Sequence, residues 1–331
     1  MPPDRELTVA VTGPTGTFGA GLVPLLEADD RIGRVVGVAR RDFDPASRGW
    51  SKMEYQRGDV RDRTTLERAF RGADVVVHLA FLVMGGDQHD SRAINVEGTL
   101  NAFRAAASAG VRRFVYASSV AAYGFHRDNP VGMTEDWPAR PARALSYAQE
   151  KAELEGLLAE ESRTHPDVDL FLLRPPIVVG PHAVGAKGLP GVLAPLGGLL
   201  AKAPRRLPVP LPGPVPDLPL QLIHEDDVGT ALLACVVGDG PPGAYNIAAD
   251  DVLSIVDVAR ELGVLPVPIP GGPVRAAARA VSRLPVLPAA VQWVEAVGQP
   301  AIMDTTRAKE LLGWSPQVSA LEALRQTLST R

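Results

Sequence analysis

Short apolar runs alternate with longer amphipathic segments through the first half of the chain. In five runs β-branched and other apolar residues are continuous rather than placed at every second position, which predicts buried strands over Leu7–Thr12, Arg34–Ala39, Asp74–Leu79, Arg113–Ala117 and Leu170–Leu173. Helical spacing between these runs predicts helices over Thr64–Phe70, Ile94–Ala109 and Tyr147–Glu161. The alternation predicts an α/β fold with a doubly wound parallel sheet that helices cover on both faces.

Proline changes the pattern in the second half of the chain. Nine prolines and four glycines fall within Pro190–Pro219, which excludes a long helix or a central strand there. Strand and helix patterns return over Leu220–Val237 and Ala244–Ile247, and the segment from Leu253 to Arg331 is mostly helical in pattern. We therefore predict a sheet domain of residues 1–181 plus about 220–249, and a smaller, mostly helical domain of about 182–219 plus 250–331.

Composition narrows the class of protein. The 331 residues include 34 Lys and Arg against 38 Asp and Glu, and the resulting net charge of −4 gives no indication of nucleic-acid binding. The single cysteine, Cys235, excludes an internal disulfide and a multi-thiolate metal site, and we expect no metal. The first residues lack a signal-peptide pattern, and prolines interrupt the best membrane candidate, Gly188–Ala203. We expect a cytoplasmic protein without a membrane partner.

A glycine-rich turn joins the first predicted strand to a helix over Ala20–Glu27. Glycines in this spacing let a backbone turn tightly against a pyrophosphate, whose charge then meets the helix N-terminus. An ordinary glycine-rich turn is the alternative, but the place between strand and helix favours a Rossmann dinucleotide site. The residues predicted to contact the cofactor here are Gly13, Thr15, Gly16, Thr17, Phe18 and Gly19.

The end of the second strand selects the cofactor. An NAD site usually has an acidic residue at this point, but the chain reads Ala39-Arg40-Arg41. A small residue leaves room for a 2′-phosphate, and Arg40 can bind that phosphate, so NADP(H) is the favoured cofactor and NAD(H) is possible. The alternative is that both arginines are solvated surface residues. Farther on, Asp59 and Val60 could contact adenine, or Asp59 or Asp62 could cap a helix.

A candidate catalytic pair lies on one predicted helix. Tyr147 and Lys151 are four residues apart and share a face, and a nearby cation favours the phenolate of a tyrosine, whose ordinary pKa is about 10. A solvent-facing helix pair is the alternative. Ser118 and Ser119 follow a predicted strand, at the sheet edge where such folds bind ligands.

Together these segments resemble an extended short-chain dehydrogenase/reductase, the group that contains NAD-dependent epimerases, dehydratases and several ketone reductases. The resemblance runs through the chain, from Thr12–Gly19 through Val115–Gly124 and Tyr147–Lys151 to Thr305–Pro316. It implies that Tyr147 is the general acid or base, that Lys151 holds the nicotinamide ribose and lowers the pKa of the tyrosine, and that Ser119 binds the substrate carbonyl. It further implies a homodimer and cofactor contacts from Leu79, Ala80, Ser118, Pro175, Ile177 and Val178, beside a packed His78 and a helix-anchoring Asn95.

The substrate region decides between reactions. Sugar-nucleotide members of the group usually carry an Asn after the Leu-Arg strand and an Arg before the Ile-His segment, and neither stands near Arg174 or His224. Apolar segments remain around the predicted pocket, at 81–84, 207–211 and 286–293. We therefore expect NADPH-dependent reduction of a ketone on a bulky, largely apolar small molecule. The alternatives are an NAD-dependent sugar-nucleotide epimerase or dehydratase and a non-catalytic NADP-binding regulator.

Overall fold

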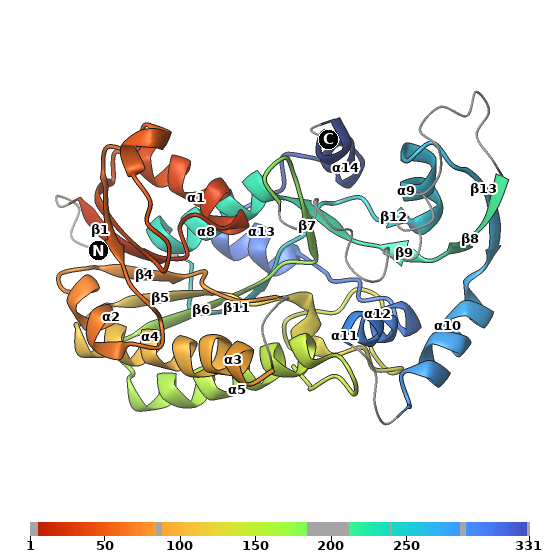
Figure 1. Cartoon of the computed structure of the whole chain (residues 1–331), viewed down its shortest axis with the longest axis horizontal. Coiled ribbons are helices and arrows are strands. Elements are labelled where there is room, and N and C mark those ends of the chain that lie inside the picture. The colour runs from red at the N-terminus through yellow and green to blue at the C-terminus, as the bar shows by residue number, and fades with distance from the viewer. Residues whose placement is uncertain (1–5, 84–87, 184–211, 239, 285–288, 330–331) are drawn as a thin grey trace.

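The computed structural model describes residues 6–83, 88–183, 212–238, 240–284 and 289–329. Its centre is a seven-stranded, all-parallel sheet in the order β11-β6-β5-β4-β1-β2-β3 (Figure 1). The order reverses between β1 and β4, and ligands bind outside the carboxyl ends of the strands at such a point. The predicted doubly wound sheet is confirmed, with strands β1 (Leu7–Thr12), β2 (Ile32–Ala39), β3 (Met53–Arg57), β4 (Val75–His78), β5 (Arg113–Ala117), β6 (Asp169–Arg174) and β11 (Gly243–Asn246).

Helices cover both faces of this sheet (Figure 1). One face carries α1 (Thr17–Ala28) and α8 (Glu225–Val237), and the other carries α2 (Arg63–Ala69), α4 (Gly98–Ser108) and α5 (Ser146–Thr164). The predicted helix over Ile94–Ala109 is a π-helical turn, η2 (Ala93–Glu97), followed by α4. Short helices fill the connections: η1 (Pro45–Arg48), α3 (Gln88–Arg92) and η3 (Val120–Tyr123).

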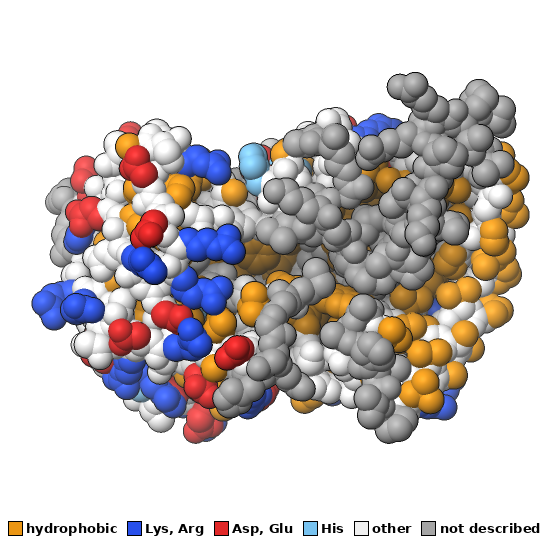
Figure 2. Space-filling view, viewed as in Figure 1, with side chains coloured by type: hydrophobic (Ala, Val, Ile, Leu, Met, Phe, Trp, Pro, Cys, Tyr) orange, Lys and Arg blue, Asp and Glu red, His pale blue; other side chains and the backbone are white. Residues whose placement is uncertain are grey.

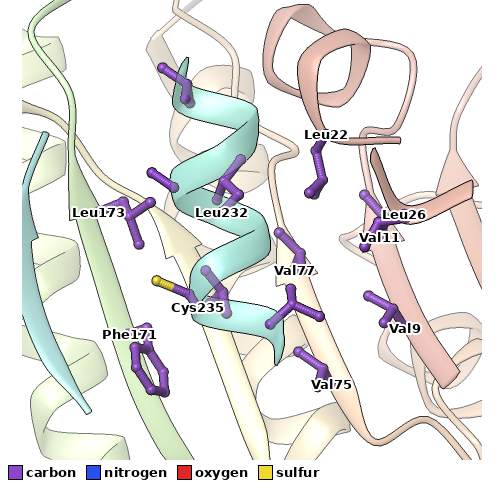
Figure 3. Close-up of a cluster of buried hydrophobic side chains, with 14 of the residues drawn as sticks. Val9, Val11, Leu22, Leu26, Val75, Val77, Phe171, Leu173, Leu232 and Cys235 are labelled. Carbon is purple, nitrogen blue, oxygen red and sulfur yellow. The ribbon is translucent and has the colours of Figure 1, made fainter. Parts of the chain in front are cut away.

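The core on the α1 and α8 face explains the continuous apolar runs. Alternate residues of a strand point to opposite faces, so a sheet buried on both faces needs apolar side chains at every position. Figure 3 shows Leu232 and Cys235 of α8 packed over Val75, Val77 and Phe171 of the strands beneath. Helices α1 and α8 pack closely through two glycines, because a Cβ on Gly21 would lie 2.3 Å from the carbonyl oxygen of Glu225 and one on Gly229 would lie 2.3 Å from that of Gly21.

Helix α13 (Thr306–Leu312) packs beside α8 and β11, and the other remaining described elements form a lobe beside the sheet (Figure 1). Its predicted helices are present, but three two-stranded pairs join them: β7 with β10, β8 with β13 and β9 with β12. Strand β8 lies in the proline-rich segment and, as predicted there, joins no central sheet; residues 190–211 lie outside the described residues. Its partner β13 is also rich in proline, but it lies in a segment that was predicted to be mostly helical. The bounds are β7 (Ile177–Val179), β8 (Pro212–Asp217), β9 (Pro219–Leu220), β10 (Leu222–His224), β12 (Leu253–Ser254), β13 (Leu265–Pro270), α9 (Ile255–Glu261), α10 (Gly271–Val281), α11 (Ala289–Gln292), α12 (Val294–Gly298), α13 (Thr306–Leu312) and α14 (Ala320–Ser329).

On the face that Figure 2 shows, the described side chains differ between the two ends of the molecule. Figure 2 shows basic and acidic side chains mixed over the end that the sheet forms, and mainly hydrophobic side chains over the end that the lobe forms. Over the described parts of the chain, no helix is long and apolar enough to cross a membrane. The predicted domain boundaries and cellular location stay predictions.

Candidate active site

The glycine-rich turn after β1 is shaped by close backbone approaches. Gly13 has φ of +70°, and a Cβ on it would lie 3.0 Å from the backbone nitrogen of Ala80. A Cβ on Gly19 would lie 2.1 Å from the carbonyl oxygen of Pro14. Helix α1 begins with Thr17 and Phe18, directly after Thr15 and Gly16 of the turn. The first N–H groups of the helix have no partner within the helix and face the turn. The turn therefore has the narrow backbone cradle that a dinucleotide pyrophosphate requires.

Replacing Gly19 with alanine tests this cradle. We expect Gly19→Ala to displace the turn and to lower dinucleotide affinity by at least about tenfold, because the new methyl group cannot fit beside Pro14. Gly156→Ala, in the open middle of α5, is the matched control and should raise the free energy of unfolding by about 0.5–1 kcal/mol. Equal dinucleotide affinity in both variants, measured by fluorescence titration, would contradict the role of the turn.

The residues predicted to select the cofactor lie at the ends of β2 and β3. Arg40 and Arg41 are exposed and can reach a ligand. The Asp59 carboxylate is paired with Arg61 at 2.7 Å, and hydrogen bonds from Arg61, aided by the charge of Arg40, lower its pKa. Asp62, not Asp59, is the N-cap of α2. Val60 is buried in the core, so the adenine contacts of Asp59 and Val60 stay predictions.

His78, at the end of β4, and Thr12, at the end of β1, form buried hydrogen bonds that fix the backbone after β4. His78 bonds Thr12 at 2.8 Å and Thr99 at 3.1 Å, and burial lowers its pKa to about 3, so it is neutral at physiological pH. The Thr12 hydroxyl also accepts hydrogen bonds from the backbone N–H groups of Leu79 and Ala80. This role of Thr12 was not anticipated from the sequence. Among the described residues, no group of three or more His, Cys, Asp or Glu could hold a metal.

Asn95 anchors the segment that follows Ala80. Its side chain accepts a hydrogen bond from the backbone nitrogen of Leu82 at 2.8 Å and donates one to the carbonyl oxygen of Leu82 at 3.0 Å. A third bond, at 2.7 Å, joins it to Glu150 of α5. Asn95 therefore acts as the predicted anchor and joins the β4 exit to the helix that carries Tyr147.

The structure brings Ser119, Tyr147 and Lys151 together. Ser119 lies just after β5 and caps η3, while Tyr147 and Lys151 lie on successive turns of α5. Burial raises the pKa of Tyr147, and the nearby Ser119 side chain lowers it by less, so the pKa is raised overall. A protonated phenol beside a serine hydroxyl can deliver a proton to a substrate oxygen.

Lys151 is enclosed more fully than the resemblance implies. Its side chain is 2% exposed and donates hydrogen bonds to the Tyr116 hydroxyl at 2.9 Å and to the Ala117 carbonyl oxygen at 2.8 Å. The ring centre of Phe81 lies 3.6 Å from the Lys151 Nζ, and the ring centre of Tyr147 lies farther away, at 6.0 Å. Burial lowers the pKa of Lys151 to about 7. The expected ribose contact and the effect of Lys151 on the Tyr147 pKa stay predictions.

The depressed pKa of Lys151 predicts a pH-dependent stability. The unfolded chain holds this proton up to about pH 10.5 and the folded chain only up to about pH 7, so between these values the unfolded state binds more protons. The wild type should therefore gain free energy of unfolding relative to Lys151→Met as the pH rises from 7 to 10. Urea unfolding without cofactor measures this. Lys309→Met, which removes a surface partner of Asp250, is the control for the loss of a lysine. If the free energies of unfolding of the wild type and Lys151→Met changed with pH in parallel, the prediction would be contradicted.

A buried ionic network adjoins the site, and the sequence reasoning did not find it. Ser118 donates to Glu155 at 2.6 Å, and Arg174 pairs with the same carboxylate at 2.5 Å. Arg174 also donates to the Tyr123 hydroxyl at 2.7 Å, which donates to Asn246 at 2.8 Å. Ser118 is thus turned toward Glu155 within the protein. The only sequence signal was that Glu155 follows Lys151 by four residues on α5, which places both on one face.

The remaining predicted contacts lie after β6. The carbonyl oxygen of Pro175 accepts a hydrogen bond from the backbone of Val120 at 2.9 Å, which joins the exits of β5 and β6. Ile177 and Val178 are half-buried in β7, which pairs with β10 outside the main sheet. This places them on the connection toward the lobe, and their contact with the nicotinamide carboxamide stays a prediction.

A doubly wound sheet with this glycine turn and a Ser–Tyr–Lys group defines an extended short-chain dehydrogenase/reductase. The model of the NAD-dependent epimerase/dehydratase family matches residues 9–248, and the chain belongs to that family. An uncharacterized protein of Mycobacterium bovis, Mb0513, is 29% identical over 97% of this chain and 83% of its own length. Sterol demethylase protein B of Methylococcus capsulatus is 35% identical over 53% of this chain and 52% of its own. The Bordetella bronchiseptica enzyme WbmG, solved with NAD and UDP, has a TM-score of 0.72 at 20% identity over 100% of this chain and 95% of its own.

Proposed function

We propose that the protein is a nicotinamide-dinucleotide-dependent oxidoreductase that acts on a carbon bearing a hydroxyl or carbonyl group of a small molecule. The observation that supports this most is the meeting of Ser119, Tyr147 and Lys151 at the carboxyl edge of the sheet. A nicotinamide dinucleotide bound at the Gly13–Gly19 turn would supply or accept the hydride. Tyr147 gives a proton to the substrate oxygen in reduction and removes one in oxidation, while Ser119 holds that oxygen.

Sugar nucleotides are the substrate class that the comparisons support best. The family is named for epimerases and dehydratases, and the similar structure of WbmG was solved with NAD and UDP. Such an enzyme would oxidise one carbon of the sugar and return the hydride later in the same turnover. This proposal takes the place of the ketone reductase that the sequence favoured, because the family comparison supports it better. Two of the apolar segments behind the ketone hypothesis, 207–211 and the start of 286–293, lie outside the described residues.

Reduction of an apolar ketone is the second candidate, and the walls of the site favour it. The ring centres of Phe81 and Trp293 lie 5.7 and 5.6 Å from that of Tyr147, so the acid–base group is flanked by apolar surface. Apolar walls suit an uncharged ring system near the reacting carbon. The name of the Methylococcus relative, which refers to a sterol, points the same way.

One pair of assays separates the candidates. The purified protein is incubated with NAD and UDP-glucose, UDP-galactose or dTDP-glucose, and separately with NADPH and a panel of cyclic ketones. Epimerised or dehydrated sugar together with co-purified NAD would support the first candidate, and NADPH oxidation with a ketone would support the second. Dinucleotide binding without turnover in either assay would contradict both enzymatic candidates and would favour a non-catalytic NADP-binding regulator.

The choice of dinucleotide is tested at Arg40. If Arg40 binds the 2′-phosphate of NADP(H), Arg40→Asp should lower the ratio of NADPH to NADH affinity by at least about tenfold, because attraction becomes repulsion. Arg71→Asp, an exposed arginine between α2 and the start of β4, is the matched control. An unchanged ratio in Arg40→Asp would instead support NAD, the cofactor bound to WbmG. A homodimer and a cytoplasmic location remain part of this proposal.

A further inference from the structure

The helix that carries Tyr147 begins without a cap of its own. Its N-cap residue is Leu145, whose side chain accepts no hydrogen bond. Glu295 of α12 instead holds the three residues that lead into the helix: one carboxylate oxygen accepts from the backbone nitrogen of Arg143 at 2.8 Å, and the other accepts from those of Ala144 at 2.7 Å and Leu145 at 3.0 Å. The Glu295 side chain is buried, so water does not compete for these bonds.

A second side chain of the lobe continues the same arrangement. The Gln292 amide oxygen accepts hydrogen bonds from both the backbone nitrogen and the hydroxyl of Ser146, each at 3.2 Å. Four successive backbone N–H groups before Tyr147 are therefore bound by two side chains about 150 residues farther along the chain. Helix N-termini attract anions and need acceptors, and here the lobe supplies both.

Trp293, between these two residues, contacts the catalytic tyrosine itself. Its ring stacks on that of Tyr147 with centres 5.6 Å apart and planes inclined by 27°. Phe81 meets Tyr147 edge-on at 5.7 Å. The Tyr147 ring therefore touches an aromatic residue of the lobe and one of the sheet domain, which fixes its plane from two separate parts of the chain.

We propose that Gln292–Glu295, here called the clasp, is a positioning and specificity element for the Tyr147 reaction. Glu295 and Gln292 are positioning residues that fix the start of α5, and Trp293 fixes the tyrosine ring and forms a wall beside the reacting carbon. That wall selects substrates that present a flat or ring-shaped apolar face, such as a steroid-like ring or the C–H face of a sugar. This inference rests on the acid–base role of Tyr147 in the proposed function.

A cap that only stabilised the fold would lower stability without a specific effect on turnover. The clasp differs because its bonds end one residue before Tyr147, and a displacement of about 1 Å in a reacting group can cost 10²-fold in rate. Ser254, which caps α9 in the same lobe through a local capping box, provides the matched control. Its loss removes side-chain hydrogen bonds that hold another helix start of the lobe, away from α5.

The first experiment compares Glu295→Ala, Glu295→Gln and Ser254→Ala. In Glu295→Ala, hydrogen exchange of the amides of residues 143–146 should quicken at least tenfold and kcat should fall at least tenfold. The KM for the dinucleotide should stay within twofold, and Glu295→Gln, which keeps an acceptor, should lie between Glu295→Ala and the wild type. Ser254→Ala should lose stability but keep kcat. Unchanged exchange at 143–146, or a kcat that falls only as in Ser254→Ala, would overturn the proposal.

The second experiment examines Trp293→Ala and Trp293→Phe. Burial raises the pKa of Tyr147, so removal of its aromatic cover should shift the alkaline limb of the pH–rate profile to lower pH, and phenylalanine should restore it. Trp293→Ala should also raise KM for ring-shaped substrates more than for small ones. If the alkaline limb did not shift in Trp293→Ala, and KM rose equally for ring-shaped and small substrates, the proposed role of Trp293 as a wall of the site would be overturned.

Failure of the proposed function remains distinguishable from failure of the clasp. If the wild type turns over no tested substrate, the acid–base proposal fails, but ultraviolet titration of Tyr147, isolated by subtracting Tyr147→Phe, still reports its pKa. A lower Tyr147 pKa in Trp293→Ala, with faster exchange at 143–146 in Glu295→Ala, supports the positioning contacts. Wild-type behaviour in both measurements overturns them.

Discussion

Tyr147→Phe should lower kcat by about 10²- to 10⁴-fold, the range usual for loss of a general acid or base. Phenylalanine keeps the ring that stacks on Trp293 and meets Phe81, so only the proton donor is lost. Dinucleotide affinity should stay within about threefold of the wild type. Steady-state rates with the substrate identified by the assays above, together with fluorescence titration of the dinucleotide, measure both quantities.

Tyr245→Phe is the control for this experiment. It removes the hydroxyl of another tyrosine, which donates to the Pro241 carbonyl oxygen, away from Ser119 and Lys151. Its kcat should match the wild type within about twofold. A Tyr147→Phe enzyme with near wild-type kcat would remove Tyr147 from the chemistry and would leave Lys151, with its depressed pKa of about 7, as the next proton donor to test.

Glu155→Ala should lower the free energy of unfolding by about 3–5 kcal/mol. Glu155 and Arg174 have side chains only 4% and 6% exposed, so loss of the carboxylate leaves a guanidinium buried without its counter-charge. Burial lowers the pKa of Arg174, but Glu155 and Tyr123 together raise it by more, so the guanidinium stays charged. Urea unfolding at neutral pH gives the difference from the wild type.

Glu153→Ala, two residues earlier on the same helix, is the matched control. Glu153 pairs with Arg92 at 2.6 Å, but the side chains are 36% and 50% exposed, and surface pairs of this kind contribute about 0–1 kcal/mol. If Glu155→Ala does not fold, the double variant Glu155→Leu with Arg174→Met should recover a folded protein, because it removes both buried charges. Equal stability losses at positions 153 and 155 would show that burial does not set the cost.

The sheet was predictable because its signal is local. Strands β1 and β5 begin and end where the apolar runs do, and β2 and β6 extend those runs by one or two residues. Strand β3 is not among the predicted apolar runs, because its sequence MEYQR is largely polar at the sheet edge. The π-helical turn before α4 and the pairing of β8 with β13 depend on contacts between distant segments, which no local pattern reports.

The candidate site divides in the same way. Gly13, Gly19, Ser119, Tyr147 and Lys151 were found because each motif lies within a few residues of a strand end or on one helix face. The contacts of Glu295 and Trp293 join residues about 150 positions apart, and neither side chain belongs to a motif. The substrate class was the weakest inference, because it relied on anchors being absent, and the family comparison now favours the alternative.

The position of β11 at the edge of the sheet has a consequence for biosynthesis. Strand β6 ends at Arg174, and its partner β11 is complete only at Asn246, 72 residues later. At about 5–20 residues per second, a nascent chain waits roughly 4–14 s with the apolar edge Leu170–Leu173 unpaired. Unpaired edges of this kind template association with other chains. We therefore expect soluble yield on overexpression to depend on chaperone supply and growth temperature more strongly than the stability of the finished protein would suggest.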